Sequence, residues 1–244
     1  MAVIEVKNFS KAFEGRFVHK DVSFKVEKGE CLGLVGGSGI GKSVILRSLI
    51  GLERPTSGEI WIEGEEISKY SERDLISIRK KVAYVFQNGA LFDSMSVFEN
   101  LAYPLREHTQ LNETEIKKRV HAQLEEFGLL EAEYKLPAEL SGGMQKRVGL
   151  MRSLMMGPKV ILYDEPTAGL DPYNTLKIRE ICLQLKEKGV TSIFVTHDMP
   201  TAEAVCDRYC LLGQGRVLDE RKVSELQNDT HGPLEKFILG QVGG

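Results

Sequence analysis

The spacing of apolar positions changes along the chain and divides it into segments of different predicted structure. Apolar and polar residues alternate over residues 1–30 and again over 58–64, as in strands with one buried face. From about residue 88 to 157 the apolar positions recur every three or four residues, which predicts helices. Short, largely apolar runs predict buried strands, and they lie at residues 30–35, 82–86, 159–163 and 192–196.

The helical segment contains signals for helix ends. Ser96 and Glu99 have the spacing of a capping box, in which each side chain bonds the backbone N–H of the other residue. A second helix is predicted over residues 114–127, because its apolar residues share one face and Gly128 follows as a stop.

Strands and helices alternate again after this segment, and no internal repeat or Gly/Ser-rich linker interrupts the chain. We therefore expect a single domain over residues 1–240. Its core and β subdomain are formed by residues 1–87 and 158–220, and residues 88–157 are inserted as a helical lobe. Residues 221–244 form a C-terminal extension.

A glycine-rich segment lies between the first apolar run and a predicted helix. It reads GGSGIGKS and fits the phosphate-loop pattern G-x-x-x-x-G-K-[ST] at every fixed position. Glycines let backbone N–H groups wrap around phosphates, and the helix N-terminus adds a partial positive charge. We expect Lys42 to neutralise the β- and γ-phosphates and the Ser43 hydroxyl to ligate Mg²⁺. The predicted phosphate-binding residues are Gly36, Gly37, Ser38, Gly39, Ile40, Gly41, Lys42 and Ser43.

Two carboxylates, Asp164 and Glu165, end the third apolar run and are followed at once by Pro166. Open α/β sheets bind ligands at the carboxyl ends of their strands. We expect Asp164 to hold Mg²⁺ through water, and Glu165 to act as the general base on the attacking water. The proline stops the strand and fixes the direction of the pair.

A third motif, Ser141-Gly142-Gly143, precedes a predicted helix that continues to Leu154. Serine is a good N-cap. The two glycines leave the helix start without side chains, so that its N–H groups can meet an anion closely.

Together, the phosphate loop, the Ser-Gly-Gly turn and the strand with two carboxylates resemble the ATPase subunits of ATP-binding-cassette (ABC) transporters. The resemblance covers residues 3–217. It implies an α/β fold with a RecA-like P-loop NTPase core, an antiparallel β subdomain and an inserted α-helical subdomain. It also implies ATP hydrolysis with ATP and Mg²⁺ as cofactors. The anion at Ser141 would be the γ-phosphate held by a second subunit, so the resemblance implies a homodimer.

The same resemblance implies roles for four further residues, which occur in the order that the family has. Gln87 matches a glutamine that senses Mg²⁺ and water, and Asp171 matches the acid of the D-loop. His197 matches the switch histidine that contacts the γ-phosphate. Phe13 lies where an aromatic residue stacks on adenine; the alternative is packing in the core, which is open to the nearby Phe9 and Phe17 as well.

Composition narrows the class of protein. A net charge of −3 argues against a nucleic-acid partner. No apolar run approaches the length of a membrane span, and the N-terminus does not resemble a signal peptide. Together with these observations, the resemblance to ABC transporter ATPases implies a peripheral protein at the cytoplasmic face of the inner membrane. Without C-x-x-C spacing, buried reduced thiols are expected for Cys31, Cys182, Cys206 and Cys210.

Two shorter strings, residues 87–100 and Met144–Leu150, resemble a narrower group, the ATPases of Mla-type phospholipid transporters. The resemblance implies a motor that moves phospholipids between membranes of the bacterial envelope, with integral membrane permease subunits as partners. In ABC transporters the region of residues 88–100 forms a groove for a short helix of the permease. The candidate groove residues here are Leu91, Phe92, Met95 and Phe98.

The tail at residues 233–240 also resembles the C-terminus of that group, where the extension contacts a partner, here a small regulatory subunit. A frayed amphipathic end is the alternative. Two other functions fit the main motifs. One is an ATPase for an importer or a cell-division complex with non-lipid cargo. The other is a soluble ABC ATPase acting on nucleic acid or in iron–sulfur assembly, although the coiled-coil insertion of DNA-repair relatives is absent from the sequence.

Overall fold

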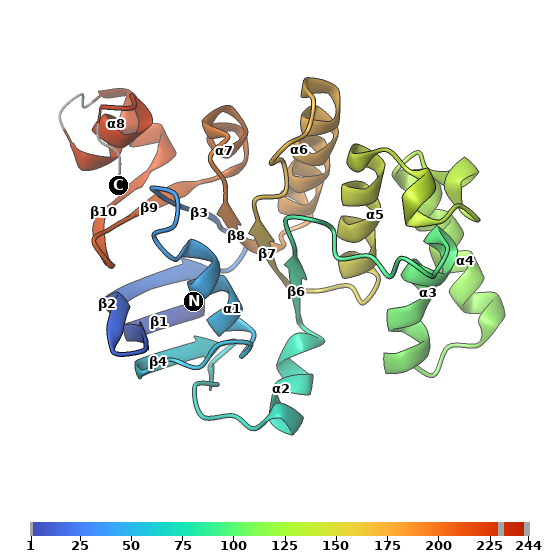
Figure 1. Cartoon of the computed structure of the whole chain (residues 1–244), viewed down its shortest axis with the longest axis horizontal. Coiled ribbons are helices and arrows are strands. Elements are labelled where there is room, and N and C mark those ends of the chain that lie inside the picture. Colours follow the sequence, from blue (N-terminus) through green and yellow to red (C-terminus); the bar gives the residue numbers. More distant parts are fainter. Residues whose placement is uncertain (1, 229–231, 242–244) are drawn as a thin grey trace.

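A computed structural model describes residues 2–228 and 232–241, and in it the strands form two sheets (Figure 1). The first sheet is antiparallel, with the order β2-β1-β4-β5. Alternate residues of its strands are buried, in agreement with the alternation in the sequence. Its strands are β1 (Ala2–Phe13), β2 (Arg16–Glu27), β4 (Ser57–Ile62) and β5 (Glu65–Glu66).

The second sheet has six strands in the order β10-β9-β3-β8-β7-β6. Its strands from β9 to β6 are parallel, and β10 pairs antiparallel with β9. The central strands are buried almost throughout, as the apolar runs predict. The strands are β3 (Cys31–Gly36), β6 (Val82–Val85), β7 (Val160–Asp164), β8 (Thr191–Val195), β9 (Arg208–Gly213) and β10 (Arg216–Lys222).

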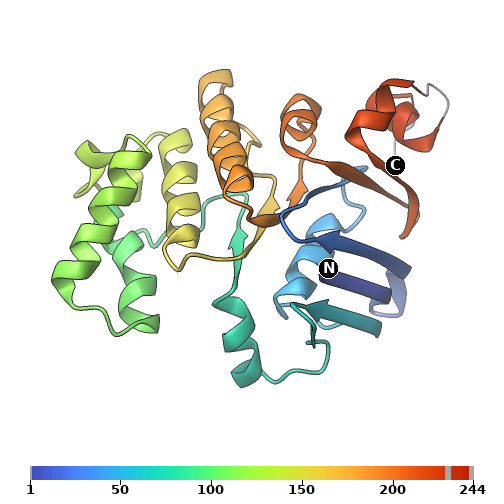
Figure 2. The same cartoon turned by 180° about the vertical axis from the view of Figure 1, so that it is seen from behind.

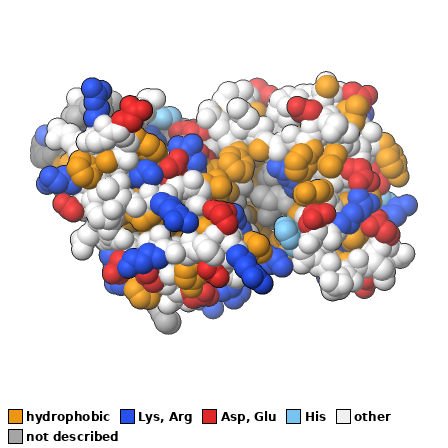
Figure 3. Space-filling model, turned by 60° about the horizontal axis from the view of Figure 1, so that its bottom comes forward, with side chains coloured by type: hydrophobic (Ala, Val, Ile, Leu, Met, Phe, Trp, Pro, Cys, Tyr) orange, Lys and Arg blue, Asp and Glu red, His pale blue; other side chains and the backbone are white. Residues whose placement is uncertain are grey.

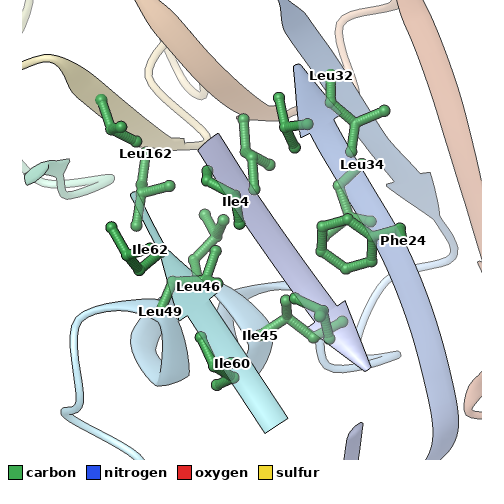
Figure 4. Close-up of a cluster of buried hydrophobic side chains, with 14 of the residues drawn as sticks. Ile4, Phe24, Leu32, Leu34, Ile45, Leu46, Leu49, Ile60, Ile62 and Leu162 are labelled. Carbon is green, nitrogen blue, oxygen red and sulfur yellow. The ribbon is translucent and has the colours of Figure 1, made fainter. Parts of the chain in front are cut away.

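Helices cover both faces of the parallel sheet. On one face, α1 (Lys42–Leu49) packs between the two sheets, where Leu46 contributes to a cluster with Ile4 and Leu162 (Figure 4). On the other face, α6 (Pro172–Glu187) and α7 (Met199–Val205) enclose a second cluster. This double coverage is the reason that the central strands lack polar alternation. All four cysteines are free and buried, as predicted.

The inserted segment forms a helical lobe with its own apolar cluster. It contains α3 (Val97–His108), α4 (Glu113–Glu126) and α5 (Gly142–Leu154), with short 3-10 helices at Leu130–Ala132 and Pro137–Glu139. One expected detail is wrong. Ser96 accepts the N–H of Glu99, but the Glu99 carboxylate pairs with Arg106 instead of closing a capping box. The helix α2 (Glu72–Arg79) lies outside this lobe (Figure 1).

The C-terminal extension folds back onto the core beyond β10. After a 3-10 turn at Val223–Asn228, α8 (Pro233–Ile238) packs beside β9 and β10 (Figure 2). Leu234 is buried in the cluster below α6 and α7, and the Glu235 carboxylate pairs with Arg221 at 3.2 Å. The described part of the extension is therefore ordered against its own chain. Across the described residues, no helix is both long and apolar enough to span a bilayer.

Candidate functional site

A cavity of about 870 Å³ opens at the carboxyl ends of the parallel strands. At this edge β3, β7 and β8 end at Gly36, Asp164 and Val195. Segments far apart in the sequence meet here because parallel strands place the loops that follow them at one edge. Among the residues predicted for nucleotide and metal binding, those lining the cavity are Ser38, Gly39, Gly41, Lys42, Ser43, Gln87, Glu165 and His197.

The phosphate loop joins β3 to α1 through glycines with left-handed backbone angles. Gly39 and Gly41 have φ values of 76° and 96°, which residues with a Cβ rarely adopt. A Cβ on Gly36 would lie 2.5 Å from the backbone oxygen of Leu212. Ile40 instead packs against the apolar cluster under α1. The loop therefore follows a path that only this placement of glycines allows.

The start of α1 is open toward the cavity. Gly41 caps the helix without a side chain, and the first turn holds no acidic residue. The Lys42 Nζ atom donates to the carbonyl oxygens of Gly36 and Gly37, at 2.8 and 2.9 Å. Burial lowers the pKa of Lys42, and two nearby carboxylates oppose that shift. Free helix N–H groups beside an ammonium are the donors that a phosphate requires.

Oxygen donors for a metal ion meet at the end of β7. The Ser43 hydroxyl donates to Oδ1 of Asp164 at 2.7 Å, and the Tyr84 hydroxyl donates to Oδ2 at 2.6 Å. Gln87 lines the same cavity. The described residues contain no cluster of three or more His, Cys, Asp or Glu ligands. A hydroxyl, a carboxylate and an amide fit Mg²⁺, which takes most of its other ligands from phosphates and water.

Glu165 and His197 face each other across the ends of β7 and β8. The His197 Nε2 atom lies 3.2 Å from Oε1 of Glu165, and the His197 backbone N–H donates to Oε2 at 3.2 Å. Glu165 has a φ of 52°, an uncommon angle for a residue with a side chain. Its N–H donates to the oxygen of Val195 at 2.9 Å. This backbone bend turns the carboxylate toward the loop after β8.

Two contacts at this site involve residues that sequence analysis did not single out. Tyr84 is a buried tyrosine in an otherwise aliphatic strand, and such a hydroxyl needs a partner. That requirement is a signal in the sequence, although it does not identify Asp164. Lys146, on α5, donates to the carbonyl oxygen of Ala168 at the cavity rim. Nothing in the spacing of the motifs predicts this second bond.

The Ser-Gly-Gly motif and Asp171 lie outside the cavity. Ser141 is the N-cap of α5 and accepts the N–H of Met144 at 3.3 Å, as predicted for a helix start. Asp171 caps α6 and accepts the N–H of Asn174 at 2.9 Å. The two helix starts touch, because a Cβ on Gly143 would lie 2.2 Å from the Asn174 side chain. Space beside Gly142 is open. Within one chain the motif thus lies apart from the cavity that the phosphate loop lines.

Phe13 does not line the cavity. It lies at the end of β1 with 41% of its surface exposed, and the Lys11 ammonium sits 4.6 Å from its ring centre. The β1–β2 hairpin does contact the phosphate loop, because Nε2 of the buried His19 lies 2.9 Å from the oxygen of Gly41. That bond requires the tautomer with its hydrogen on Nε2. Phe13 therefore lies on an open surface of a hairpin that contacts the loop through His19.

The candidate groove residues differ in exposure. Phe92 is 41% exposed, and its ring lies 5.0 Å from that of Tyr103 and 5.0 Å from the Arg152 guanidinium carbon. Leu91 and Phe98 are half-buried against the lobe cluster. Figure 3 shows one face of the molecule, on which apolar side chains gather over the helical lobe at the right, among charges of both signs. Phe92 is thus the accessible member of the set.

Comparisons with known proteins place the chain in one group. A model of the ABC transporter family matches residues 19–168. A methionine import ATP-binding protein, MetN, of Carboxydothermus hydrogenoformans is 39% identical over 98% of this chain and 72% of its own length. A probable ribonucleotide transport ATP-binding protein, mkl, of Mycobacterium leprae is 43% identical over 86% of this chain and 60% of its own length. The chain thus spans less than two thirds of the second relative.

Solved structures agree with the sequence relatives. A dimeric ATP-binding cassette, MJ0796, in a post-hydrolysis state with ADP and Pi, has a TM-score of 0.84 and 31% identity, covering 90% of this chain and 98% of that one. The protein cbiO1 of Clostridium perfringens, part of the ABC transporter complex cbiONQ, has a TM-score of 0.84 and 30% identity, covering 99% of this chain and 94% of that one.

Proposed function

Since this chain belongs to the ABC transporter family, in which it is an ATP-hydrolysing subunit, we propose that it is the motor of a membrane transporter and that phospholipid is the cargo. The observation that carries the motor role is the meeting of Lys42, Ser43, Gln87, Glu165 and His197 around one cavity. These side chains come from four segments of the chain. Each carries a chemical group that ATP binding or hydrolysis needs.

Within that site each residue has a proposed task. Lys42 and the bare start of α1 bind the phosphates, and Ser43 with Asp164 and Gln87 holds Mg²⁺. Bound Mg²⁺ supplies positive charge that neutralises the β- and γ-phosphates. Glu165 accepts the proton of the attacking water, while His197 orients that carboxylate and contacts the γ-phosphate.

We propose that the complete site forms between two copies of the chain. The Ser141-Gly142-Gly143 turn presents an uncovered helix start, with open space beside Gly142, but it does not line its own cavity. A second copy would bring this turn to the phosphate held by the first. The dimeric state of the MJ0796 cassette supports this arrangement. Asp171, which caps α6 next to the turn, would then lie at the contact between copies.

We propose that the chain lies at the cytoplasmic face of the inner membrane and that Phe92 contacts a permease there. An exposed aromatic ring supported by Tyr103 and Arg152 is a suitable anchor for a short helix. Phe13 remains the proposed partner of adenine, because its open ring can stack on a base. A regulatory partner at the C-terminal extension would have to bind Leu239, which is exposed, since Leu234 is already buried.

The cargo proposal rests on the resemblance of residues 87–100 and Met144–Leu150 to phospholipid transport ATPases. A second cargo class has its own support, because MetN, a methionine import protein by name, is 39% identical over 98% of this chain. The fold and site do not separate the two, since both cargoes would be recognised by the permease.

One experiment separates the cargoes. The full chain carrying an affinity tag is purified from membranes of its own host with its permease, and the complex is reconstituted in nanodiscs. ATP hydrolysis is then measured with added phospholipid or with methionine and other amino acids. Stimulation by phospholipid, together with lipid found by mass spectrometry in the purified complex, supports the proposal. Stimulation by an amino acid alone would replace it with the importer.

A further inference from the structure

The carboxylate of Asp164 is held on both sides by hydroxyl groups. Ser43, from the start of α1, donates to Oδ1 at 2.7 Å, and Tyr84, from β6, donates to Oδ2 at 2.6 Å. Tyr84 pairs with Leu162 in the parallel register, so its side chain reaches forward to the end of the neighbouring strand. Both bonds are short enough to be strong hydrogen bonds to a charged acceptor.

The Tyr84 hydroxyl acts as a fixed donor. The residue is only 9% exposed, and its ring lies 4.4 Å from that of Phe86. A tyrosine hydroxyl is protonated at neutral pH, so it serves as the donor to Oδ2 of Asp164. A donor on an immobilised ring cannot follow a rotating carboxylate, and it therefore selects one orientation of that carboxylate.

We propose that Tyr84 is a positioning residue for the metal site, whose hydroxyl holds the Asp164 carboxylate with Oδ1 directed to Ser43 and the cavity. This inference rests on the proposed function, because it takes Asp164 and Ser43 as the groups that hold Mg²⁺. Tyr84 itself would not contact the metal, since its hydroxyl is occupied by Oδ2. Because Tyr84 already holds the Asp164 side chain in one orientation, less conformational entropy is lost when the metal binds.

The test measures metal affinity apart from turnover. Glu165→Gln chains, which are expected to bind ATP without hydrolysing it, are saturated with ATP, and Mn²⁺ binding is followed by the electron paramagnetic resonance of free Mn²⁺. Tyr84→Phe keeps the ring and removes the hydroxyl, and it should weaken Mn²⁺ binding about tenfold, as loss of a partner behind a metal ligand does. Tyr84→Met also lacks the hydroxyl and should give the same shift.

The matched control is Tyr209→Phe. Tyr209 is a buried tyrosine on β9 of the same sheet, and its hydroxyl has no hydrogen-bond partner among the described residues. This variant should leave Mn²⁺ affinity unchanged. ATP binding in EDTA should match between Tyr84→Phe and the control, because only the metal site is altered.

Three results would overturn the inference. Unchanged Mn²⁺ affinity in Tyr84→Phe would show that the hydroxyl positions nothing. Equal losses of Mn²⁺ binding and of metal-free ATP binding would show a general disruption of the site. An Asp164→Asn variant shows whether a negative result concerns Tyr84 alone or the proposed metal site as a whole. If Asp164→Asn also leaves Mn²⁺ affinity unchanged, then Asp164 does not hold the metal, and both proposals fail.

Discussion

His197 contacts both carboxylate oxygens of Glu165, through its ring nitrogen at 3.2 Å and through its own backbone N–H at 3.2 Å. His197 thus fixes the Glu165 carboxylate from two directions. The carboxylate cannot turn away from the cavity without losing both contacts. This geometry leads to the first prediction, on the residue that we propose as general base.

Glu165→Gln should reduce ATP hydrolysis by about 10²–10⁴-fold, because the amide cannot accept the proton of the attacking water. ATP affinity should be retained, since Lys42 and the start of α1 are untouched. Steady-state hydrolysis and equilibrium binding of a fluorescent ATP analogue measure the two effects. Glu187→Gln, an exposed substitution on α6, is the control and should behave as wild type. Wild-type turnover in Glu165→Gln would remove this residue from the chemistry.

Ser141→Arg should leave ATP binding by the single chain intact and block hydrolysis. The bulky cation would cover the helix start of α5, which we propose faces the phosphate of a second copy. Lys42→Ala should instead weaken ATP binding itself. Mixing the two variants should restore part of the activity, since a heterodimer contains one site with an intact loop and an intact turn. If heterodimers form and the mixture stays inactive, either the turn of one chain does not complete the site of the other or both sites are required for hydrolysis.

Phe92→Asp should weaken binding to the permease by about 2 kcal/mol or more, because a charge would be buried at the contact and an aromatic anchor lost. The isolated subunit should still fold, since the guanidinium of Arg152 beside the ring can pair with the new carboxylate. Pull-down of the co-expressed permease in detergent measures the loss. Ile76→Asp, exposed on α2, is the control. Full retention of the permease by a folded Phe92→Asp would assign this ring to packing alone.

The free energy of unfolding should decrease as the pH falls below about 6.5, in part because of His19. Burial lowers the pKa of His19 in the fold from its usual 6.5, although the bond to Gly41 opposes the shift. The unfolded chain therefore binds a proton at a higher pH than the folded chain. Acidification then favours unfolding, by up to about 1.4 kcal/mol for each pH unit below 6.5 until the folded pKa is reached.

His19→Gln should flatten that dependence, because glutamine can offer an N–H to the oxygen of Gly41 and does not titrate. Urea unfolding at several pH values from 5 to 8 is the measurement. His108→Gln, at an exposed position in α3, should keep the slope of the wild type. An equal slope in His19→Gln would mean that other groups cause the loss of stability in acid.

Much of the fold could be predicted because its signals are local. The continuous apolar runs identified the central strands, and the motif around Lys42 and Ser43 requires a strand, a loop and a helix in that order. Asp164 could be placed beside Ser43 because the end of β7 and the loop that leads from β3 to α1 lie at the same edge of the parallel sheet. The α/β class and the ABC ATPase fold are therefore confirmed.

Other contacts, which no motif or local spacing encodes, could not be predicted. Gly149 in α5 is an example, since a Cβ there would lie 2.5 Å from the backbone of Gly89. This approach ties the helix behind the Ser-Gly-Gly turn to the segment that follows Gln87. The Glu99 carboxylate likewise pairs with Arg106, about two helix turns further along α3, and does not turn back to the N–H of Ser96. In both cases a neighbour outside the recognised motif decided the outcome.

The order of strands in the parallel sheet has a consequence for synthesis of the chain on the ribosome. The phosphate-loop strand β3 is made early, but its partners are β8 and β9, which begin at Thr191 and Arg208. A nascent chain that ends before residue 191 leaves both edges of the apolar strand β3 unpaired. The antiparallel sheet, in contrast, can form once residue 66 has emerged. Unpaired apolar edges promote aggregation. The nucleotide site is thus assembled late, and a chain truncated before β8 would be a substrate for chaperones and not a smaller ATPase.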